Sequence, residues 1–425
     1  MSVPVHPAIR RASSALAYRD FRVMWAGACV SSIGTWMQKV AQSWLVLTLT
    51  GSPFYLGLDA FLGEMPILLF VLVGGVVADR LDRRRILLVS QYVQMSTAFA
   101  LAILVYLDVV RIWHVLALSC ITGTAQAFGS PAYQSLLPML VRRHDVPNAI
   151  ALNSIQFNLA RIIGPLAAGV ALAAFGSAAC FALNGLSFLV VVASLLALRV
   201  VSAPVVSSRS VRDELCGGLA FVRRHAAIRA FMFLAFCTAL LGSPVLTLLP
   251  VIVQRVFHQD AAGFSRMMAF SGAGSVVGAL IVAWLGRFSR MACTAVALQA
   301  LLGVLLVAFG ASRVLPVSYA LLFFGSIALM MVFSLLTSLV QLEAPDDMRG
   351  RVMSIYTMAF RGGTPLGAIA AGALAARTSA PVALMATGAL LTVLVGVFAW
   401  RSSEHWEPDP SGRGGADYSG GSQTQ

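Results

Sequence analysis

Twelve long stretches of mostly apolar residues, separated by short polar or charged segments, constrain this chain more than any other feature. As helices, they are long enough to cross a hydrocarbon core of about 30 Å. They fall at residues 21–49, 53–78, 86–107, 112–137, 149–174, 178–199, 229–252, 266–287, 291–311, 315–342, 350–375 and 380–400. The stretches lack the period-two alternation of a membrane β-barrel, and helices satisfy their own backbone hydrogen bonds in lipid. The sequence predicts an all-α membrane protein with twelve transmembrane helices.

The positive charges predict how the chain is oriented. Of the 30 Lys and Arg residues, 22 lie in segments on the same side as the N-terminus, and five lie on the other side. Because basic loops remain on the cytoplasmic side, we expect both termini in the cytoplasm. The arginines are spread over separate short loops, so the net charge of +13 reflects topology and does not indicate a nucleic-acid partner.

The order of the stretches predicts two bundles joined by a linker. We expect a cytoplasmic N-terminal segment at 1–20, a six-helix bundle at 21–199, a linker at 200–228, a second six-helix bundle at 229–400 and a disordered cytoplasmic tail at 401–425. The linker becomes amphipathic from Val211 to His225. This pattern predicts a helix that lies on the cytoplasmic leaflet.

An internal repeat supports the two-bundle organisation. Residues 153–166 align with residues 353–366 at an offset of 200, with matching serine, isoleucine, arginine, proline and leucine. The repeat places Arg161 and Arg361 at equivalent positions in the fifth and eleventh stretches. We therefore expect two pseudo-symmetric bundles, with both arginines near the central pathway at a similar depth.

The segment between the second and third stretches, residues 75–85, reads Gly-Val-Val-Ala-Asp-Arg-Leu-Asp-Arg-Arg-Arg. Such a short hairpin places its arginines at one membrane face. This pattern resembles the loop motif of the major facilitator superfamily. We expect Asp79 to bond the amides that begin the eleventh helix, or nearby arginines, and so close this face in one state. The predicted gating residues are Gly75, Asp79, Arg80, Arg83, Arg84, Arg349 and Arg351.

Further motifs narrow the resemblance. Gly34-Thr-Trp-Met-Gln38, Pro147-Asn148, Arg161 with Gly164-Pro165, and Arg349-Gly-Arg351 together resemble the enterobactin-exporter and macrolide-efflux branch of that superfamily, over residues 20 to 400. The resemblance implies alternating access, a bacterial inner-membrane location and export of drug-type compounds by proton antiport. The chain departs from the branch at Asp82, where many superfamily members have glycine, and at Gly34-Thr35, which replaces an acidic residue.

The energy source follows from the residue inventory. Lys39 is the only lysine and does not follow a glycine-rich loop, so the chain has no phosphate-binding P-loop. The histidines and cysteines predict neither a metal site nor a membrane-embedded catalyst, so we expect no cofactor and no enzyme activity. The candidate coupling groups inside the membrane are Lys39, Asp59, Glu64, Arg161 and Arg361.

Two of these charges lie at matching depths. Lys39 and Glu64 are about 16 Å of helix from the same end of their stretches, so we expect an ion pair between neighbouring helices. Glu64 could then be a proton carrier or one half of a structural lock. Asp59 is shallower and is predicted to lie in a vestibule.

Polar side chains on several stretches could line a central cavity. The predicted lining residues are Gln38, Gln42, Gln126, Tyr133, Gln134, Asn158, Gln341 and Tyr356. Interhelical hydrogen bonding is the competing interpretation for polar residues in membrane helices.

The sequence therefore predicts a monomeric secondary transporter that works by alternating access and exports an amphipathic organic compound against proton entry. Its expected partners are a small-molecule substrate, protons and the lipid bilayer. An uptake or facilitative carrier and a transport-inactive sensor or scaffold remain alternatives. Two arginines on one cavity would favour anionic or oxygen-rich cargo over permanent cations.

Overall fold

The structure, a computed structural model, describes residues 14–199, 211–346 and 348–402. At residues 71, 72, 76, 78–80, 211–216 and 402 it describes the backbone alone. The expected N-terminal segment before Ser14, linker residues 200–210 and tail residues 403–425 lie outside this part of the chain.

The described residues of the N-terminal half form five long helices. They are α2 (Arg19–Thr50), α3 (Pro53–Arg80), α4 (Arg83–Tyr106), α5 (Ile112–Leu136) and α6 (Val146–Leu196), with short turns η1 (Ser14–Ala17), η2 (Leu137–Leu140) and η3 (Arg143–Asp145). α6 contains two predicted spans. It bends at Gly176, whose φ of 77° is in the left-handed region that glycine adopts without strain. The chain thus reverses direction within a single residue.

The C-terminal half begins with the linker helix α7 (Val211–Arg224), which occupies the segment predicted to be amphipathic. The first span of this half is built from α8 (Ala226–Cys237), a π-helical turn η4 (Thr238–Gly242) and α9 (Pro244–Arg255). The remaining helices are α10 (Ala261–Leu285), α11 (Met291–Ala311), α12 (Leu315–Glu343), α13 (Arg349–Arg377) and α14 (Ala380–Ser402).

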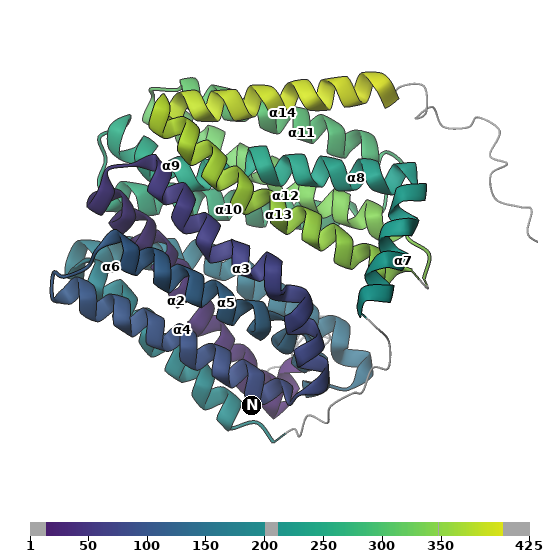
Figure 1. The fold of residues 1–425 in the computed structure, drawn as a ribbon, viewed down its shortest axis with the longest axis horizontal. Coiled ribbons are helices and arrows are strands. Elements are labelled where there is room, and N and C mark those ends of the chain that lie inside the picture. Colours follow the sequence, from purple (N-terminus) through teal and green to yellow (C-terminus); the bar gives the residue numbers. More distant parts are fainter. Residues whose placement is uncertain (1–13, 200–210, 347, 403–425) are drawn as a thin grey trace, which may run out of the picture.

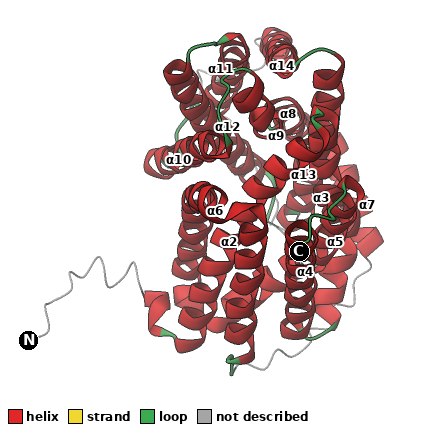
Figure 2. Ribbon diagram, turned by 90° about the vertical axis from the view of Figure 1, so that its left-hand side faces the viewer, coloured by secondary structure: helices red, strands yellow, loops and turns green. Residues whose placement is uncertain are grey.

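Across the described residues, these helices make the twelve predicted crossings, and the architecture is all-α (Figure 2). By length and hydropathy alone, eight helices qualify as membrane spans. One of the eight is the bent α6, which crosses twice. The other three crossings are α2, α5 and α13, whose interiors carry many of the polar residues expected to be functional.

Two seams join the bundles. α3 of the first bundle packs on α13 of the second, and α6 packs on α10; Figure 2 shows both pairs side by side. These seams contain α6 and α13, the two helices that the internal repeat relates. The repeat therefore marks equivalent positions in a pseudo-symmetric pair of bundles.

Glycines bring the backbones into contact at the seams. A Cβ on Gly57 would lie 2.4 Å from the Ala368 carbonyl oxygen, and one on Gly272 would lie 2.3 Å from the Arg161 carbonyl oxygen. Small residues permit such close helix crossings in membranes, where dispersion contacts drive association. At these two positions, the backbones of the two bundles are in close contact.

The molecule has two faces, which we name by their helix ends. The terminal face holds the beginning of α2 at Arg19 and the end of α14 at Ser402, whereas the distal face holds the α2–α3 and α9–α10 connections. In Figure 1, α3 and α13 approach each other on the left, at the distal face, and diverge toward α7 on the right.

The seam glycines provide a stability test. Gly272→Ala should lower the thermal unfolding midpoint of the purified protein in detergent, because overpacking a tight contact costs about 1–3 kcal/mol. The control is Gly325→Ala, since nothing lies within 4 Å of a Cβ at Gly325 and alanine raises helix propensity by up to about 1 kcal/mol. Equal midpoints for the two variants would contradict the seam.

Candidate functional site

Arg161 lies where the two bundles meet. It projects from the first arm of α6, and its Nη2 donates to Ser275 Oγ of α10 at 3.2 Å. Its Cζ lies 5.4 Å from the ring centroid of Trp36 on α2. One partly buried guanidinium therefore contacts both bundles through a hydrogen bond and a cation–π contact.

Trp36 is also within reach of a second cation. Lys39 Nζ lies 5.0 Å from the Trp36 ring centroid and 3.9 Å from Glu64 Oε1. The ion pair expected from matching depths is thus present, although the side chains of Lys39 and Glu64 are 54% and 38% exposed. A pair this open contributes less to stability than one sealed in the core.

Arg361 lies at the other seam. It is partly buried on α13, next to Gly362, whose Cβ position is 3.3 Å from Leu68 of α3. Within the described part of the chain, its guanidinium makes no hydrogen bond and no ion pair. Arg161 and Arg361 therefore both lie where one bundle crosses the other, and Arg361 retains its donors.

Asp59 is part of a polar cluster inside the first bundle. Gln42 Nε2 donates to Asp59 Oδ1 and Oδ2 at 3.0 and 2.9 Å, and Ser119 Oγ donates to Oδ1 at 2.5 Å. Gln42 Nε2 also lies 2.9 Å from Ser119 Oγ. The cluster joins α2, α3 and α5. The side-chain amide of Gln42, which was predicted to line the cavity, bonds to Asp59.

Several other predicted lining residues bond within one bundle. Asn184 Nδ2 donates to Gln38 Oε1 at 2.6 Å, and Tyr133 Oη donates to Asn153 Oδ1 at 2.7 Å. Asn158 Nδ2 bonds the Ser154 carbonyl of its own helix, at 2.9 Å. In this conformation, the interhelical interpretation describes Gln38 and Tyr133 best.

Tyr356 is buried at 4% exposure, with its hydroxyl 2.9 Å from Thr337 Oγ1. This conformation does not present the Tyr356 ring to an open space. By contrast, Gln126, Gln134 and Gln341 are exposed, and in the described part their side chains make no hydrogen bonds. Their cavity role remains a prediction.

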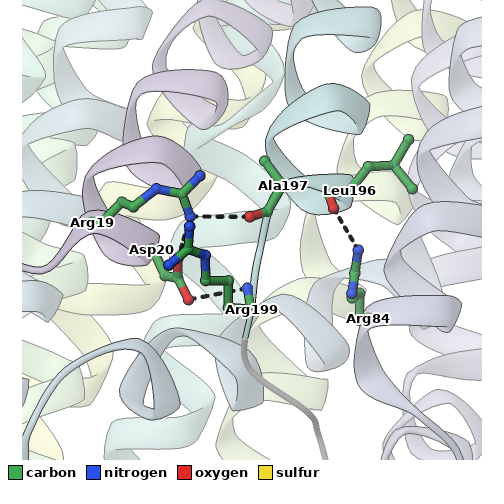
Figure 3. Close-up of polar contacts among 6 residues, drawn as sticks. All are labelled: Arg19, Asp20, Arg84, Leu196, Ala197 and Arg199. Carbon is green, nitrogen blue, oxygen red and sulfur yellow. Dashed lines mark hydrogen bonds and ion pairs between the residues drawn. The ribbon is translucent and has the colours of Figure 1, made fainter.

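Arginines of the terminal face cap the last turn of α6 (Figure 3). Arg84 Nη2 donates to the Leu196 carbonyl at 2.8 Å, and Arg19 Nη1 donates to the Ala197 carbonyl at 3.2 Å. Helix C-termini attract cations because their carbonyls are unpaired and the dipole is negative there. Arg84 of the predicted gating motif thus bonds within its own bundle.

Asp82, where the chain departs from the superfamily pattern, is the N-cap of α4. Its side chain accepts a hydrogen bond from the Arg84 backbone N–H at 2.9 Å. An N-cap aspartate satisfies one of the free amides at a helix start and offsets the basic first turn. The residue types alone could have indicated this cap.

Three other gating arginines also have local partners. Arg83 Nη1 contacts Met139 Sδ at 3.1 Å, Arg349 pairs with Asp346 at 2.6 Å, and Arg351 Nη1 contacts Met348 Sδ at 3.4 Å. A Cβ at Gly75 would meet nothing within 4 Å. The structure describes only the backbone of Asp79 and Arg80. The contact of Asp79 with the start of the eleventh helix, or with nearby arginines, therefore stays a prediction.

Contacts that the sequence did not reveal join the bundles at the distal face. Arg255, at the end of α9, donates to the carbonyl of Gly51, the C-cap of α2. Trp44 of α2 stacks on Phe264 of α10, with centroids 6.1 Å apart. Among the described residues, the hydrogen bonds and aromatic contacts between bundles lie here or at Arg161. This conformation is therefore closed at the distal face.

Asp145 organises the terminal face of the first bundle. It is buried and accepts from Ser14 Oγ and Tyr18 Oη, each at 2.6 Å, and His144 Nε2 is 3.0 Å away. The hydrogen bonds from Ser14 and Tyr18 lower the pKa of Asp145. The bond between Tyr18 and Asp145 also raises the pKa of Tyr18. This cluster fastens η1 to the turn before α6.

Comparison with known proteins identifies similar sequences over most of the chain. Residues 11–409 match the profile of a family described as transmembrane secretion effector. The staphyloferrin A transporter of Staphylococcus aureus is 25% identical over 342 residues, which are 79% of this chain and 85% of the relative. The macrolide efflux protein A of Streptococcus pyogenes is 22% identical over 382 residues, which are 87% of this chain and 93% of the relative.

The enterobactin exporter of Citrobacter koseri is 25% identical over 382 residues, 89% of this chain and 90% of the relative. Among solved structures, a bacterial homologue of the human lysosomal transporter Spinster, in an inward-facing and unoccupied conformation, matches with a TM-score of 0.72. At 12% identity, covering 96% of this chain and 100% of that chain, it shows the shared fold.

The Asp145 cluster leads to a pH-dependent prediction. Because the folded pKa of Asp145 is lowered, its stabilisation should be fully present above its unfolded pKa of about 4 and should be lost as the pH falls through the lower folded value. Asp145→Asn should lower the unfolding midpoint at pH 7, and the gap to the parent should shrink in acid. Asp346→Asn, at an exposed pair, is the control expected to change little. A gap independent of pH would refute the assignment.

Proposed function

Because the chain belongs to the transmembrane secretion effector family of the major facilitator superfamily, we propose that it exports an amphipathic organic compound in exchange for protons. The family and its relatives are transporters and not enzymes, and the chain is a multi-pass membrane protein. The motifs of residues 34–38 and 147–165 identified the branch correctly. Export, proton exchange and cargo class are the parts that we propose.

The observation that carries the proposal is the charge at the seams. Arg161 bridges the bundles through Ser275, Arg361 retains free donors, and Lys39 stands beside Trp36. Glu64 offsets a single one of these three cations. Guanidinium groups bind carboxylate and other oxygen-rich groups strongly, and the Trp36 ring offers an apolar face. The arrangement fits an anionic or polyoxygenated amphipathic cargo.

The relatives support an organic cargo. They are named for staphyloferrin A, macrolides and enterobactin, and we extend the general class to this chain without choosing a compound. The bacterial inner membrane and a monomeric state are part of the same proposal.

We assign the terminal face to the cytoplasm because 22 of the 30 basic residues lie on that side. The conformation closed at the distal face is then the one that accepts cargo from inside. Rocking of the bundles about the two seams would open the distal face and close the terminal one. Alternating access of this kind releases cargo outside.

An uptake carrier of the same fold would move cargo into the cell, in the direction opposite to export. In oriented vesicles, export coupled to protons requires cargo and protons to move in opposite directions. Co-movement in one direction would favour the uptake carrier, and an absence of ligand-dependent exchange between the two open states would favour a sensor or scaffold.

The cargo proposal predicts the effect of removing an arginine. Arg161→Ala and Arg361→Ala should each weaken binding of anionic or polyoxygenated ligands about 10- to 100-fold, since a hydrogen bond to a charged group contributes about 1.5–3 kcal/mol. Competition binding on purified protein measures this. The control is Arg313→Ala, which removes a guanidinium bonded to the Gly310 carbonyl.

Binding of permanent cations in the same assay can contradict the proposed cargo class. Quaternary ammonium dyes that bind as tightly as the anionic ligands, and that ignore both substitutions, would refute the cargo class.

The gating proposal concerns Asp79 in the state closed at the terminal face. Asp79→Asn should slow turnover several-fold in proteoliposomes while protein yield stays normal, because it removes a charge from the predicted contact with the start of α13. Asp82→Asn changes the same charge in the same hairpin but keeps an N-cap side chain, so it should transport normally. Unchanged transport by Asp79→Asn would eliminate this role.

A further inference from the structure

We propose that Asp59, held by Gln42 and Ser119, is the group that binds and releases the coupling proton. The inference rests on the proposed proton exchange and deepens it, because it assigns the proton to one carboxyl group. It also assigns Glu64, the other membrane carboxyl on α3, to the ion pair.

The first argument is that this site can satisfy both forms of the carboxyl group. As a carboxylate, Asp59 accepts from the Ser119 hydroxyl at Oδ1 and from the Gln42 amide at both oxygens. With a proton on Oδ1, it can donate to Ser119 Oγ across the same 2.5 Å, and Gln42 still donates to Oδ2. The serine hydroxyl then only rotates, for example toward a carbonyl one turn back in its helix.

The second argument is the absence of a fixed counter-charge. The helices packed against α3 carry the following titratable or charged groups: Arg19, Asp20, Arg22, Cys29 and Lys39 on α2; Arg83, Arg84, Arg85, Tyr92 and Tyr106 on α4; His114, Cys120 and Tyr133 on α5; Arg255 on α9; and Arg349, Arg351, Tyr356, Arg361 and Arg377 on α13. In the described part, none of them bonds to Asp59 or forms an ion pair with it, and α4 carries no acidic or basic residue between 86 and 106. The groups that bond to Asp59 in the described part are neutral donors, so no paired cation holds the carboxyl group ionised.

Glu64 differs in this respect. The Lys39 ammonium, 3.9 Å away, balances its charge without a proton. A proton on Glu64 would leave Lys39 without that partner inside the membrane, where an uncompensated charge costs several kcal/mol. The two carboxyl groups of α3 therefore have separate tasks, one in charge balance and one in proton binding.

The third argument is position along the pathway. Asp59 lies six residues into α3 from Pro53 at the distal face, and Glu64 lies about 7.5 Å deeper along the helix. With the distal face open, a hydronium ion from outside reaches Asp59 first. An O–H bond forms at the carboxyl oxygen and water is left behind; in the state open to the cytoplasm, the proton returns to a water molecule and the carboxylate is restored.

Infrared titration of the purified full-length protein tests the proposal without any cargo. All 17 Asp and Glu residues contribute to the carboxyl C=O band that grows as the pH falls, so the test is the difference between parent and variant spectra. Asp59→Asn should lose one component of the band, and the matched control Glu64→Gln should retain that component. Ser119→Ala should retain the component but shift its midpoint, because one of the hydrogen bonds is gone. Persistence of the component in Asp59→Asn would overturn the proposal. If that variant does not fold, an unchanged midpoint in Ser119→Ala and Gln42→Leu would overturn it instead.

Transport separates this proposal from the proposed function. In proteoliposomes, Asp59→Asn should lose pH-gradient-driven transport at least tenfold but keep cargo-for-cargo exchange, which needs no net proton movement. Gradient-driven transport that survives in Asp59→Asn would refute the role of Asp59 and leave proton exchange intact. A parent protein that shows no gradient-driven transport would refute proton exchange, and the infrared titration would still decide whether Asp59 takes up a proton.

Discussion

A hydrocarbon environment offers no hydrogen bonds, and this constraint governs where most polar side chains of the described membrane helices lie. Helices satisfy the backbone, so the remaining problem is the side chains and helix ends. Asn184 bonds Gln38 inside the first bundle, Arg84 caps the end of α6 at Leu196, and Arg161 reaches across to Ser275. Each link therefore both satisfies a polar group and fixes the position of a helix. Arg361 has no such partner in the described part, and it is the cation to which the proposed function assigns the cargo.

The same constraint shapes the contact between the two bundles, which the proposed alternating access requires to move. At the seams the contact is between backbones, at Gly57 against Ala368 and at Gly272 against Arg161. At these positions no side chain stands between the two helices. The links that must break lie at one end, where Arg255 bonds Gly51 and Trp44 stacks on Phe264. In the proposed rocking about the seams, these two contacts would act as a latch at the distal face.

Much of this fold could be predicted from the sequence because its signals are local. Apolar length predicted the crossings, and matched depth predicted the Lys39–Glu64 contact. Depth alone could not predict rotation about the helix axis, so Gln38 and Tyr356 were assigned to a cavity although they bond within bundles. The distal latch was missed because a carbonyl acceptor such as Gly51 has no side-chain signature. Trp36 was noticed as part of a motif, and Lys39 lies three residues further along the same helix. Arg161 comes from α6, and no spacing along the chain reveals its contact with Trp36.

Distances between spin labels across the two faces would test the central claim, which is that the bundles rock about the seams. On a cysteine-free background, one pair of labels at Thr48 and His258 reports the distal face, and a second pair at Arg85 and Arg290 reports the terminal face; all four positions are exposed. The account predicts that cargo and pH change the two distances in opposite directions, so that the distal pair separates when the terminal pair approaches. Distances that change together, or that stay fixed under every condition, would contradict it.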